Sequence, residues 1–247
     1  MRYQRYFWVS SNTSLERILK SIGLIGGMSW ESTALYYEII NREVAARRGS
    51  LRSAPMQIAS LDFHEIAERQ KAGDWAGMAQ ILGNAAAGLQ AAGADCVLIG
   101  TNTMHKIAPE VQARIDVPLL HIADITAKAI LATGLTKVGL TGTRFTMEDA
   151  FYKERLAAHG IECVIPEPKE RDEIHRIIFS ELCQGVMSAD SKHRFLDGMA
   201  SLARRGAQGV ILGCTELPLL VNQTDTTMPL FDTTRLHALA AVEFVLG

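Results

Sequence analysis

The sequence predicts an α/β fold of two pseudo-symmetric domains, each a doubly wound parallel sheet, with the active site between them. Short apolar segments alternate with stretches of helical periodicity, a pattern typical of βαβ units. The same order of segments occurs twice along the 247 residues, and polar residues follow several of the apolar segments. Because ligands of such sheets bind beyond the carboxyl ends of the strands, these polar residues predict where the site lies.

An internal repeat is the main evidence for two similar halves. Residues 93–103 (GADCVLIGTNT) align with residues 206–216 (GAQGVILGCTE), and each segment is an apolar strand that ends in a small polar cluster. Three further pairs of segments agree with this alignment: 22–27 with 138–143, 56–61 with 161–165, and 118–121 with 229–232. The halves therefore run roughly from residue 21 to 134 and from 136 to 247.

Within each half, strands and helices follow one another in the order that a parallel sheet requires. Helix 31–48 is predicted between the strand segments 22–27 and 56–61, and helix 75–92 precedes the first copy of the repeat. The clearest helix of the second half is predicted at 147–159. Such alternation of buried strands and helices favours parallel sheets with helices on both faces.

Composition and residue spacing exclude several classes of function. The formal net charge is −2 with both signs interspersed, so nothing indicates a surface for nucleic acid or membrane. No apolar run approaches the roughly 18 residues of a membrane span. The cysteines form no CxxC pair and the histidines no HExxH or HxH pair, which argues against disulfides and against a metal site. We expect a cytoplasmic protein with a small-molecule partner.

The first 20 residues read as an N-terminal extension outside the fold. Their apolar stretch, residues 6–9, is far too short for the core of a signal peptide. We therefore expect the first domain to begin at residue 21.

Thr101 and Cys214 occupy equivalent positions of the repeat, each directly after an apolar strand. Two-fold symmetry would present them from opposite sides of a shared cleft, which suits removal of a proton from one face of a carbon and its return to the other. Cys214 precedes a predicted helical turn, whose free N–H groups should lower the pKa of the thiol and favour a thiolate base. We assign the other three cysteines to core packing, the usual role of an apolar cysteine: Cys96, Cys163 and Cys183.

Several other polar residues lie near the predicted cleft. Asn102, Thr103 and Thr215 would offer donors for a carboxylate, and the same residues are common helix caps. Arg52 and Arg144 are the cations nearest to strand-exit loops, so they are candidates for a second, distal carboxylate. For three further residues a structural role is at least as well supported as catalysis: His105, Lys106 and His121.

The glycine-rich run at residues 23–28 (GLIGGM) does not match a dinucleotide-binding motif. Its spacing is GxxGG rather than GxGxxG, so the evidence for a nucleotide cofactor is weak. We interpret the glycines as a tight strand-to-helix turn that lets backbone approach a small ligand.

Three motifs, taken in order, resemble the aspartate/glutamate/hydantoin racemase superfamily, and most closely its aspartate racemase branch. They are residues 22–33 (IGLIGGMSWEST), 101–105 (TNTMH) and 213–216 (GCTE). The resemblance implies catalysis without pyridoxal phosphate or metal, so no cofactor is expected, and a homodimer. It also implies domain exchange, in which the last strand and helix return to the first domain. The domains would then be 21–115 plus 225–247, and 116–224. Relatives begin near Leu19, so residues 1–18 are expected to come from an upstream start.

The resemblance also assigns roles to single residues. Cys214 matches the second of the family's two catalytic cysteines, whereas the first falls on Thr101. A hydroxyl has a far higher pKa than a thiol, which is about 8.5 for free cysteine, and is therefore a poor base. The residues mapped to substrate binding all lie in strand-exit loops: Met28, Ser29, Asn102, Thr103, Thr143, Thr146, Thr215 and Glu216.

The leading expectation is an isomerase that racemises an amino acid, aspartate or glutamate, with Cys214 as base and Thr101 opposite it. Two alternatives stay open at the level of sequence. One is a decarboxylase or isomerase of a small dicarboxylate, in which Cys214 alone protonates a planar enolate. The other is a catalytically degenerate protein that only binds small acids.

Overall fold

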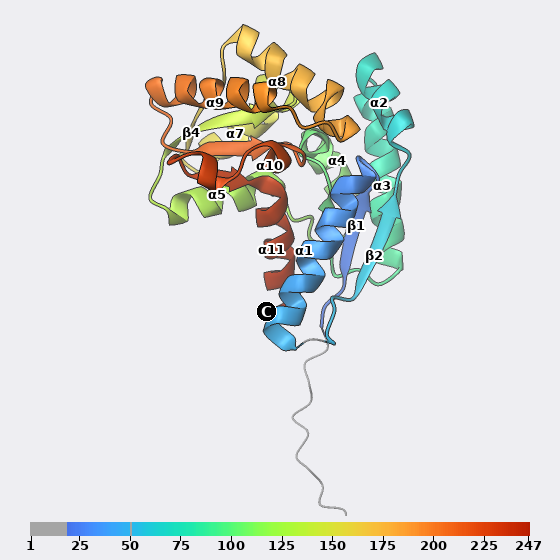
Figure 1. Ribbon diagram of the computed structural model, residues 1–247. Coiled ribbons are helices and arrows are strands. Elements are labelled where there is room, and N and C mark those ends of the chain that lie inside the picture. Colours follow the sequence, from blue (N-terminus) through green and yellow to red (C-terminus); the bar gives the residue numbers. More distant parts are fainter. Residues whose placement is uncertain (1–18, 50) are drawn as a thin grey trace, which may run out of the picture.

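In the computed structural model, which describes residues 19–49 and 51–247, the chain forms two α/β halves, each built on a parallel sheet (Figure 1). The first sheet has the order β2-β1-β3, and the second has the order β5-β4-β6-β7. The strands are β1 (Ile22–Gly26), β2 (Met56–Ser60), β3 (Cys96–Ile99), β4 (Lys137–Gly142), β5 (Glu162–Val164), β6 (Val210–Gly213) and β7 (Leu230–Asp232). The predicted fold class is confirmed.

The two sheets share one topology. Val97 of β3 forms a parallel bridge to Leu119, so the segment around Leu119 takes in the first sheet the place that β7 takes in the second. The sequence repeat therefore paired structurally equivalent segments: β1 with β4, β2 with β5, β3 with β6, and residues 118–121 with 229–232.

Helices connect the strands and cover both faces of each sheet. Their bounds are α1 (Trp30–Arg48), α2 (Phe63–Ala72), α3 (Trp75–Ala91), η1 (Thr103–Ile107), α4 (Ala108–Gln112), α5 (Ile122–Ala132), α6 (Arg144–Glu148), α7 (Ala150–Ala158), α8 (Pro168–Ser180), η2 (Leu182–Gln184), α9 (Ala189–Arg204), α10 (Leu217–Leu220), η3 (Gln223–Asp225) and α11 (Thr233–Leu246). The helix predicted at 147–159 is broken, because Asp149 has an extended backbone and separates α6 from α7.

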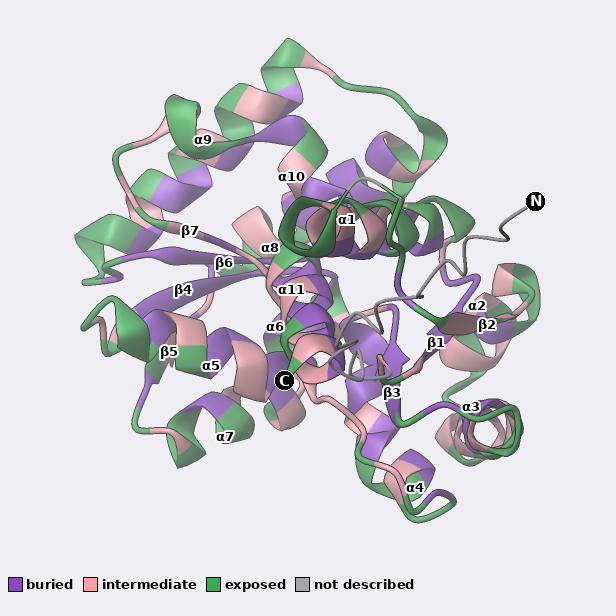
Figure 2. Ribbon diagram, turned by 90° about the horizontal axis from the view of Figure 1, so that it is seen from below, coloured by how far each residue is buried: buried purple, intermediate pink, exposed green. Residues whose placement is uncertain are grey.

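The strands of the first sheet divide their side chains between two cores, as the pleat of a strand requires. In β3, Val97 and Ile99 pack with α3, whereas Cys96 and Leu98 pack with α1 and α11. Both sets are fully buried, which explains why the segment is apolar at every position and not at alternate ones. Buried residues accordingly run along the strands and the inner helix faces (Figure 2).

The halves exchange their last helices. Helix α5 follows the first sheet but packs on the second, where Ile122 and Ile130 join the core around β4. Helix α11 follows the second sheet but packs beside α1, where Ala238 and Val242 join the core around β1 (Figure 1). Each exchange begins at the capping residue of the helix, which is His121 for α5 and Asp232 for α11. The two crossings hold the halves together.

The position of the last strand corrects the expected domain exchange. Strand β7 was expected in the first domain, but its residue Phe231 pairs with Ile211 of β6. Phe231 is buried in the core of the second half, which explains the pairing. Only α11 returns, so the chain crosses at residue 233 rather than 225. The first half also keeps the segment around Leu119, beyond the expected boundary at 115.

The expected extension lies mostly outside the described residues, which begin at residue 19. Leu19 packs against the core around β1, and the Lys20 ammonium lies 4.4 Å from the centroid of the Phe244 ring. These two residues are therefore part of the first half. Within the described part of the chain, no helix combines the length and the apolar character needed to span a bilayer.

Candidate active site between the two halves

One cavity lies where the carboxyl ends of β1, β3, β4 and β6 face one another. Its volume is about 50 Å³, and both halves supply its walls. The first half contributes Met28, Ser29, Phe63, Ile66, Gln70, Thr101, Asn102, Thr103 and Met104, and the second contributes Thr143, Ile178, Phe179, Cys183, Gly213, Cys214, Thr215 and Glu216. The location follows from the fold, because strand ends of parallel sheets gather polar loop residues at one edge.

Of the residues that the racemase resemblance maps to catalysis or substrate binding, all except Thr146 line this cavity. Thr146 is fully buried one layer behind the wall, where its hydroxyl lies 3.2 Å from that of Thr143 and 3.4 Å from that of Thr103. Thr103 and Thr143 are themselves 3.1 Å apart. This hydroxyl triad joins the end of β3 to the start of α6, and thus one half to the other.

The two residues expected to carry chemistry stand on the cavity wall in different environments. Thr101 is half-buried, and within the described residues its hydroxyl takes part in no hydrogen bond. Cys214 is 9 % exposed, and its Sγ donates to Glu216 Oε2 at 2.9 Å. Cys214 thus has a carboxylate partner, whereas the Thr101 hydroxyl has no hydrogen-bond partner among the described residues.

Glu216 is the centre of the polar network in the cavity. Its Oε2 accepts hydrogen bonds from the Thr215 hydroxyl at 2.6 Å and from the Cys214 thiol, and its Oε1 accepts one from Ser29 at 3.2 Å. A buried carboxylate is costly unless it is well hydrogen-bonded, and three donors meet that need here. Because Ser29 belongs to the first half, the carboxylate also connects the two walls.

The pKa of the Cys214 thiol is raised well above its ordinary value, which corrects the expected lowering. Burial is the largest cause, followed by the negative charge of Glu216 and the hydrogen bond that the thiol donates to it. The helix that should have favoured the thiolate, α10, has only four residues and begins three positions after the cysteine. With its pKa raised in this way, Cys214 is a protonated thiol near neutral pH.

Asn102 connects the cavity to the exchanged helix α11. Its side-chain Nδ2 donates to the Thr233 hydroxyl at 3.0 Å, and Thr233 donates to the carbonyl of Leu212 at 2.9 Å. The opposite atom of the amide, Oδ1, is buried and has no hydrogen-bond partner. Asn102 therefore connects the cavity wall to α11 through its amide N–H, while its Oδ1 is an unpaired buried acceptor.

The arginines expected to hold a distal carboxylate lie elsewhere. Arg144 is paired with Asp172 at 2.8 Å on the surface, and neither it nor Arg52 lines the cavity. Lys106 pairs with Asp149 at 2.8 Å and lies 3.9 Å from the centroid of the Trp75 ring. Among the described residues, no lysine or arginine lines the cavity.

Sequence reasoning missed the side walls of the cavity, which come from α2 and from the end of α8. Phe63, Ile66 and Gln70 lie on α2, and Phe179 lies on α8. Their spacing on a helix is that of any amphipathic helix, so nothing marked them as site residues.

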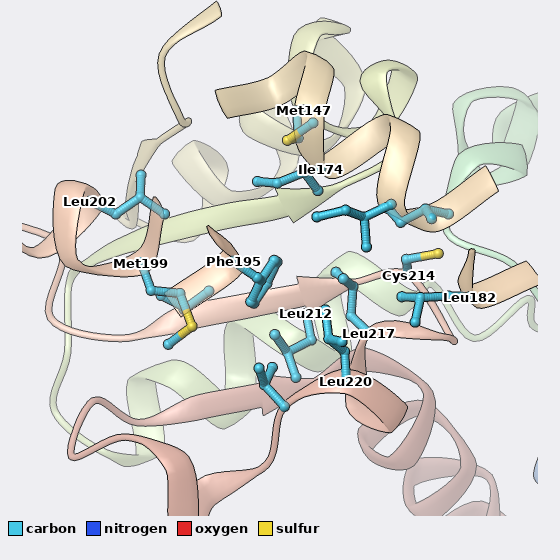
Figure 3. Close-up of a cluster of buried hydrophobic side chains, with 14 of the residues drawn as sticks. Met147, Ile174, Leu182, Phe195, Met199, Leu202, Leu212, Cys214, Leu217 and Leu220 are labelled. Atoms are coloured by element: carbon cyan, nitrogen blue, oxygen red, sulfur yellow. The ribbon is translucent and has the colours of Figure 1, made fainter. Parts of the chain in front are cut away.

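Cys183 also differs from its expected role. It packs against the core around β6, as predicted, but it also lines the cavity, and burial raises its pKa to about 12. Figure 3 shows the neighbouring Leu182 close to Cys214, so the hydrophobic cluster around β6 extends as far as the cavity.

The glycine turn after β1 behaves as the sequence suggested. Gly27 has a positive φ of 85°, and a side chain there would collide with the backbone of Leu61. Gly26 leaves room in the same way for Thr33. The turn thereby brings Met28 and Ser29 to the cavity wall. No group of three or more His, Cys, Asp or Glu residues in the described chain is arranged to hold a metal ion.

A family model described as Asp/Glu/Hydantoin racemase matches residues 25–241. The chain belongs to this racemase family. Among solved structures, a candidate Asp/Glu racemase from Yersinia pestis is 49 % identical with a TM-score of 0.88, covering 93 % of this chain and 100 % of that one. An aspartate racemase homologue from Pyrococcus horikoshii OT3 is 36 % identical with a TM-score of 0.82 and the same coverage.

A broad specificity amino-acid racemase from Bacillus subtilis (strain 168) is 23 % identical over 236 residues, which are 92 % of this chain and 98 % of that protein. These racemase relatives imply an isomerase-type enzyme. The repeat of the sequence thus corresponds to the two halves of a racemase fold, with the predicted residues at the junction between them.

Proposed function

We propose that this racemase interconverts the enantiomers of an amino acid, aspartate or glutamate, without a cofactor, and that Thr101 and Cys214 act on opposite faces of the α-carbon. One observation supports this most directly. Two side chains able to carry a proton follow equivalent strands of the two halves, and both line the same cavity. Racemisation requires proton removal on one face and proton delivery on the other, which such a pair provides.

The proposed mechanism begins with the thiol proton of Cys214. Glu216 Oε2, at 2.9 Å, is positioned to accept that proton, which leaves a thiolate and a protonated carboxyl group. An ammonium group of the substrate adds positive charge beside the sulfur, which lowers the pKa of the thiol again. The thiolate then removes the α-proton, so that the sulfur regains a proton and the α-carbon becomes a carbanion.

The opposite face depends on Thr101. When Cys214 has removed the α-proton, the Thr101 hydroxyl donates a proton to the carbanion and becomes an alkoxide. The alkoxide takes a proton from solvent and Glu216 returns its proton to solvent, which restores the starting state. In the reverse direction the Thr101 oxygen, as an alkoxide, must remove the α-proton. Because a hydroxyl is a much weaker acid and base than a thiol, this step is expected to be slow. The two enantiomers should therefore exchange their α-protons at different rates, although their equilibrium remains even.

The substrate carboxylates are proposed to bind neutral donors. Ser29, Thr103 and Thr143 offer hydroxyl groups, Gln70 offers an amide, and all four line the cavity. Since no cation lines the described wall, a side-chain carboxylate would be held by hydrogen bonds and not by an ion pair. The family and the small volume of the cavity support a small acidic amino acid.

The test is an exchange experiment with a panel of amino acids. The L- and D-forms of aspartate, glutamate and several neutral amino acids are incubated with the enzyme in deuterated water, and loss of the α-proton signal is followed by NMR. We expect exchange with aspartate or glutamate and formation of the opposite enantiomer by chiral chromatography. No exchange with any amino acid would contradict the proposal, and exchange restricted to neutral amino acids would contradict the acidic substrate.

A further inference from the structure

Three histidines cluster next to Thr101, of which His105 and His237 are buried and His121 is partly buried. His105 lies in η1, His121 caps α5 and His237 lies in α11. The ring centroid of His105 is 4.7 Å from that of His121 and 5.6 Å from that of His237. The two exchanged helices thus converge on the residue that follows Thr101 by one helical turn.

Hydrogen bonds determine the roles of the ring nitrogens of His237 and His121. His237 Nε2 donates to the carbonyl of Leu120 at 2.6 Å, so its Nδ1 accepts from the Tyr36 hydroxyl at 2.8 Å. His121 Nδ1 accepts from the backbone N–H of Ala123 at 3.2 Å. Burial lowers the pKa of His237 to about 3 and that of His121 to about 4, so both rings are neutral near pH 7.

His105 is the member of the cluster that contacts the site. Its Nδ1 donates to the backbone carbonyl of Thr101 at 2.9 Å, while its Nε2 is buried and has no partner. Burial, with further effects from the two neighbouring rings, lowers the pKa of His105 well below its ordinary value. The neutral His105 ring has only one N–H, and that donor binds the carbonyl oxygen of Thr101.

We propose that His105 is a positioning residue for the Thr101 face of the site, and that it acts by holding the Thr101 peptide. This inference rests on the proposed function. The bond from residue 105 to residue 101 closes the turn that leaves β3, and the rings of His121 and His237 fix the imidazole in place.

The second half has no equivalent support. The repeat aligns His105 with Pro218, which has no side-chain donor, and Cys214 is held instead through Glu216. The two faces of the site are therefore built differently. Removal of the His105 donor should disturb proton transfer at Thr101 and leave that at Cys214 nearly unchanged.

The experiment compares the two enantiomers in three variants of the full-length enzyme. His105→Leu removes the donor but keeps an apolar side chain, and His105→Asn keeps an N–H at a similar position. Tyr36→Phe is the matched structural control, because it removes one hydrogen bond from the far end of the same cluster. Rates of α-proton exchange in deuterated water are measured separately from the L- and D-forms, with thermal melting as the check of folding.

We expect His105→Leu to slow exchange of the enantiomer that reacts at Thr101 by ~10- to 100-fold, since small displacements of reacting groups have effects of this size. The exchange rate of the enantiomer that reacts at Cys214 should change by less than about threefold. A change of that size is too small to indicate loss of positioning. His105→Asn should restore most of the lost rate, and Tyr36→Phe should leave the ratio of the two rates unchanged. If His105→Leu does not fold, His105→Met serves as the donor-free variant.

The inference would be overturned if a folded donor-free variant slowed exchange of both enantiomers equally, or in any other way left the ratio of the two exchange rates unchanged. Either result would leave the proposed function intact, because the parent enzyme would still exchange the α-proton. Absence of exchange in the parent enzyme would instead overturn the proposed function, and with it the role of His105.

Discussion

Mild acid should destabilise this protein through its buried histidines. In an unfolded chain a histidine has a pKa of about 6.5, whereas burial lowers that of His237 to about 3 and that of His121 to about 4. Between these values the unfolded state binds more protons than the folded state, so stability falls as the pH decreases. At pH 5 each of the two histidines contributes a loss of about 2 kcal/mol relative to pH 7.5, or about 4 kcal/mol together.

One nearby group opposes this loss in part: burial raises the pKa of Asp232, so the folded state binds more protons there as the pH falls. The remaining groups of the region do not offset the loss from the histidines. His105 shifts in the same direction, so it adds to the effect. Burial raises the pKa of Asp124, but the hydrogen bonds from Arg155 and His159 outweigh burial and bring the pKa down to about 2. Its stabilising effect is present above the unfolded pKa and is therefore not lost until the pH falls below about 4.

The assay is urea denaturation followed by circular dichroism at several pH values between 7.5 and 5, which gives the free energy of unfolding at each. His237→Gln should reduce the loss of stability over this range by about 2 kcal/mol. His64→Gln, at an exposed position, is the matched control. A free energy of unfolding that stays constant or rises as the pH falls from 7.5 to 5 would refute the reasoning.

Three further predictions concern the cavity and its glycine turn. Thr101→Cys should speed α-proton exchange most for the enantiomer that reacts slowly in the parent, because a thiol is a better acid and base than a hydroxyl; exchange assays of both enantiomers decide, and no change in either rate would remove Thr101 from the mechanism. Glu216→Gln should lower the pKa of the Cys214 thiol, because the carboxylate raises that pKa, and it should also slow exchange. The pH dependence of alkylation of Cys214 by iodoacetamide measures the pKa of the thiol. An unchanged or higher pKa in the variant would contradict the prediction. Gly27→Ala should destabilise the fold by more than ~1 kcal/mol, because a Cβ would meet the backbone of Leu61 at a positive φ; denaturation midpoints test this, with Gly88→Ala, where a Cβ has open space, as the control.

The repeat in the sequence predicted more of the architecture than any single motif. Buried strands such as β3 and β6 leave a clear trace, because both faces are covered and every position is apolar. The exchange of α5 and α11 leaves no such trace. A helix with one apolar face packs equally well on either half, so only the three-dimensional arrangement decides which sheet it covers. The pairing of Phe231 with β6 likewise depends on the three-dimensional arrangement and not on a local sequence pattern.

The site was predictable at the strand ends and not on the helices. Residues such as Ser29 and Cys214 lie within three residues of a strand end, so their position in the chain locates them in the fold. Phe63 and Gln70 reach the cavity from α2, and only the three-dimensional arrangement of that helix brings them there. The pKa of Cys214 was predicted in the wrong direction because Glu216, two residues later, turns back onto the thiol. Such local folding of a side chain cannot be read from spacing.

The central claim is that Cys214 carries the α-proton of an amino acid, and exchange in deuterated water tests it most directly. The measurement compares the parent enzyme with Cys214→Ser and with Cys163→Ser, a thiol in β5 that does not line the cavity. Cys214→Ser should abolish exchange of the enantiomer that reacts at Cys214 while its thermal melting stays close to that of the parent, and Cys163→Ser should retain exchange of both enantiomers. Full exchange in Cys214→Ser would contradict the thiol mechanism.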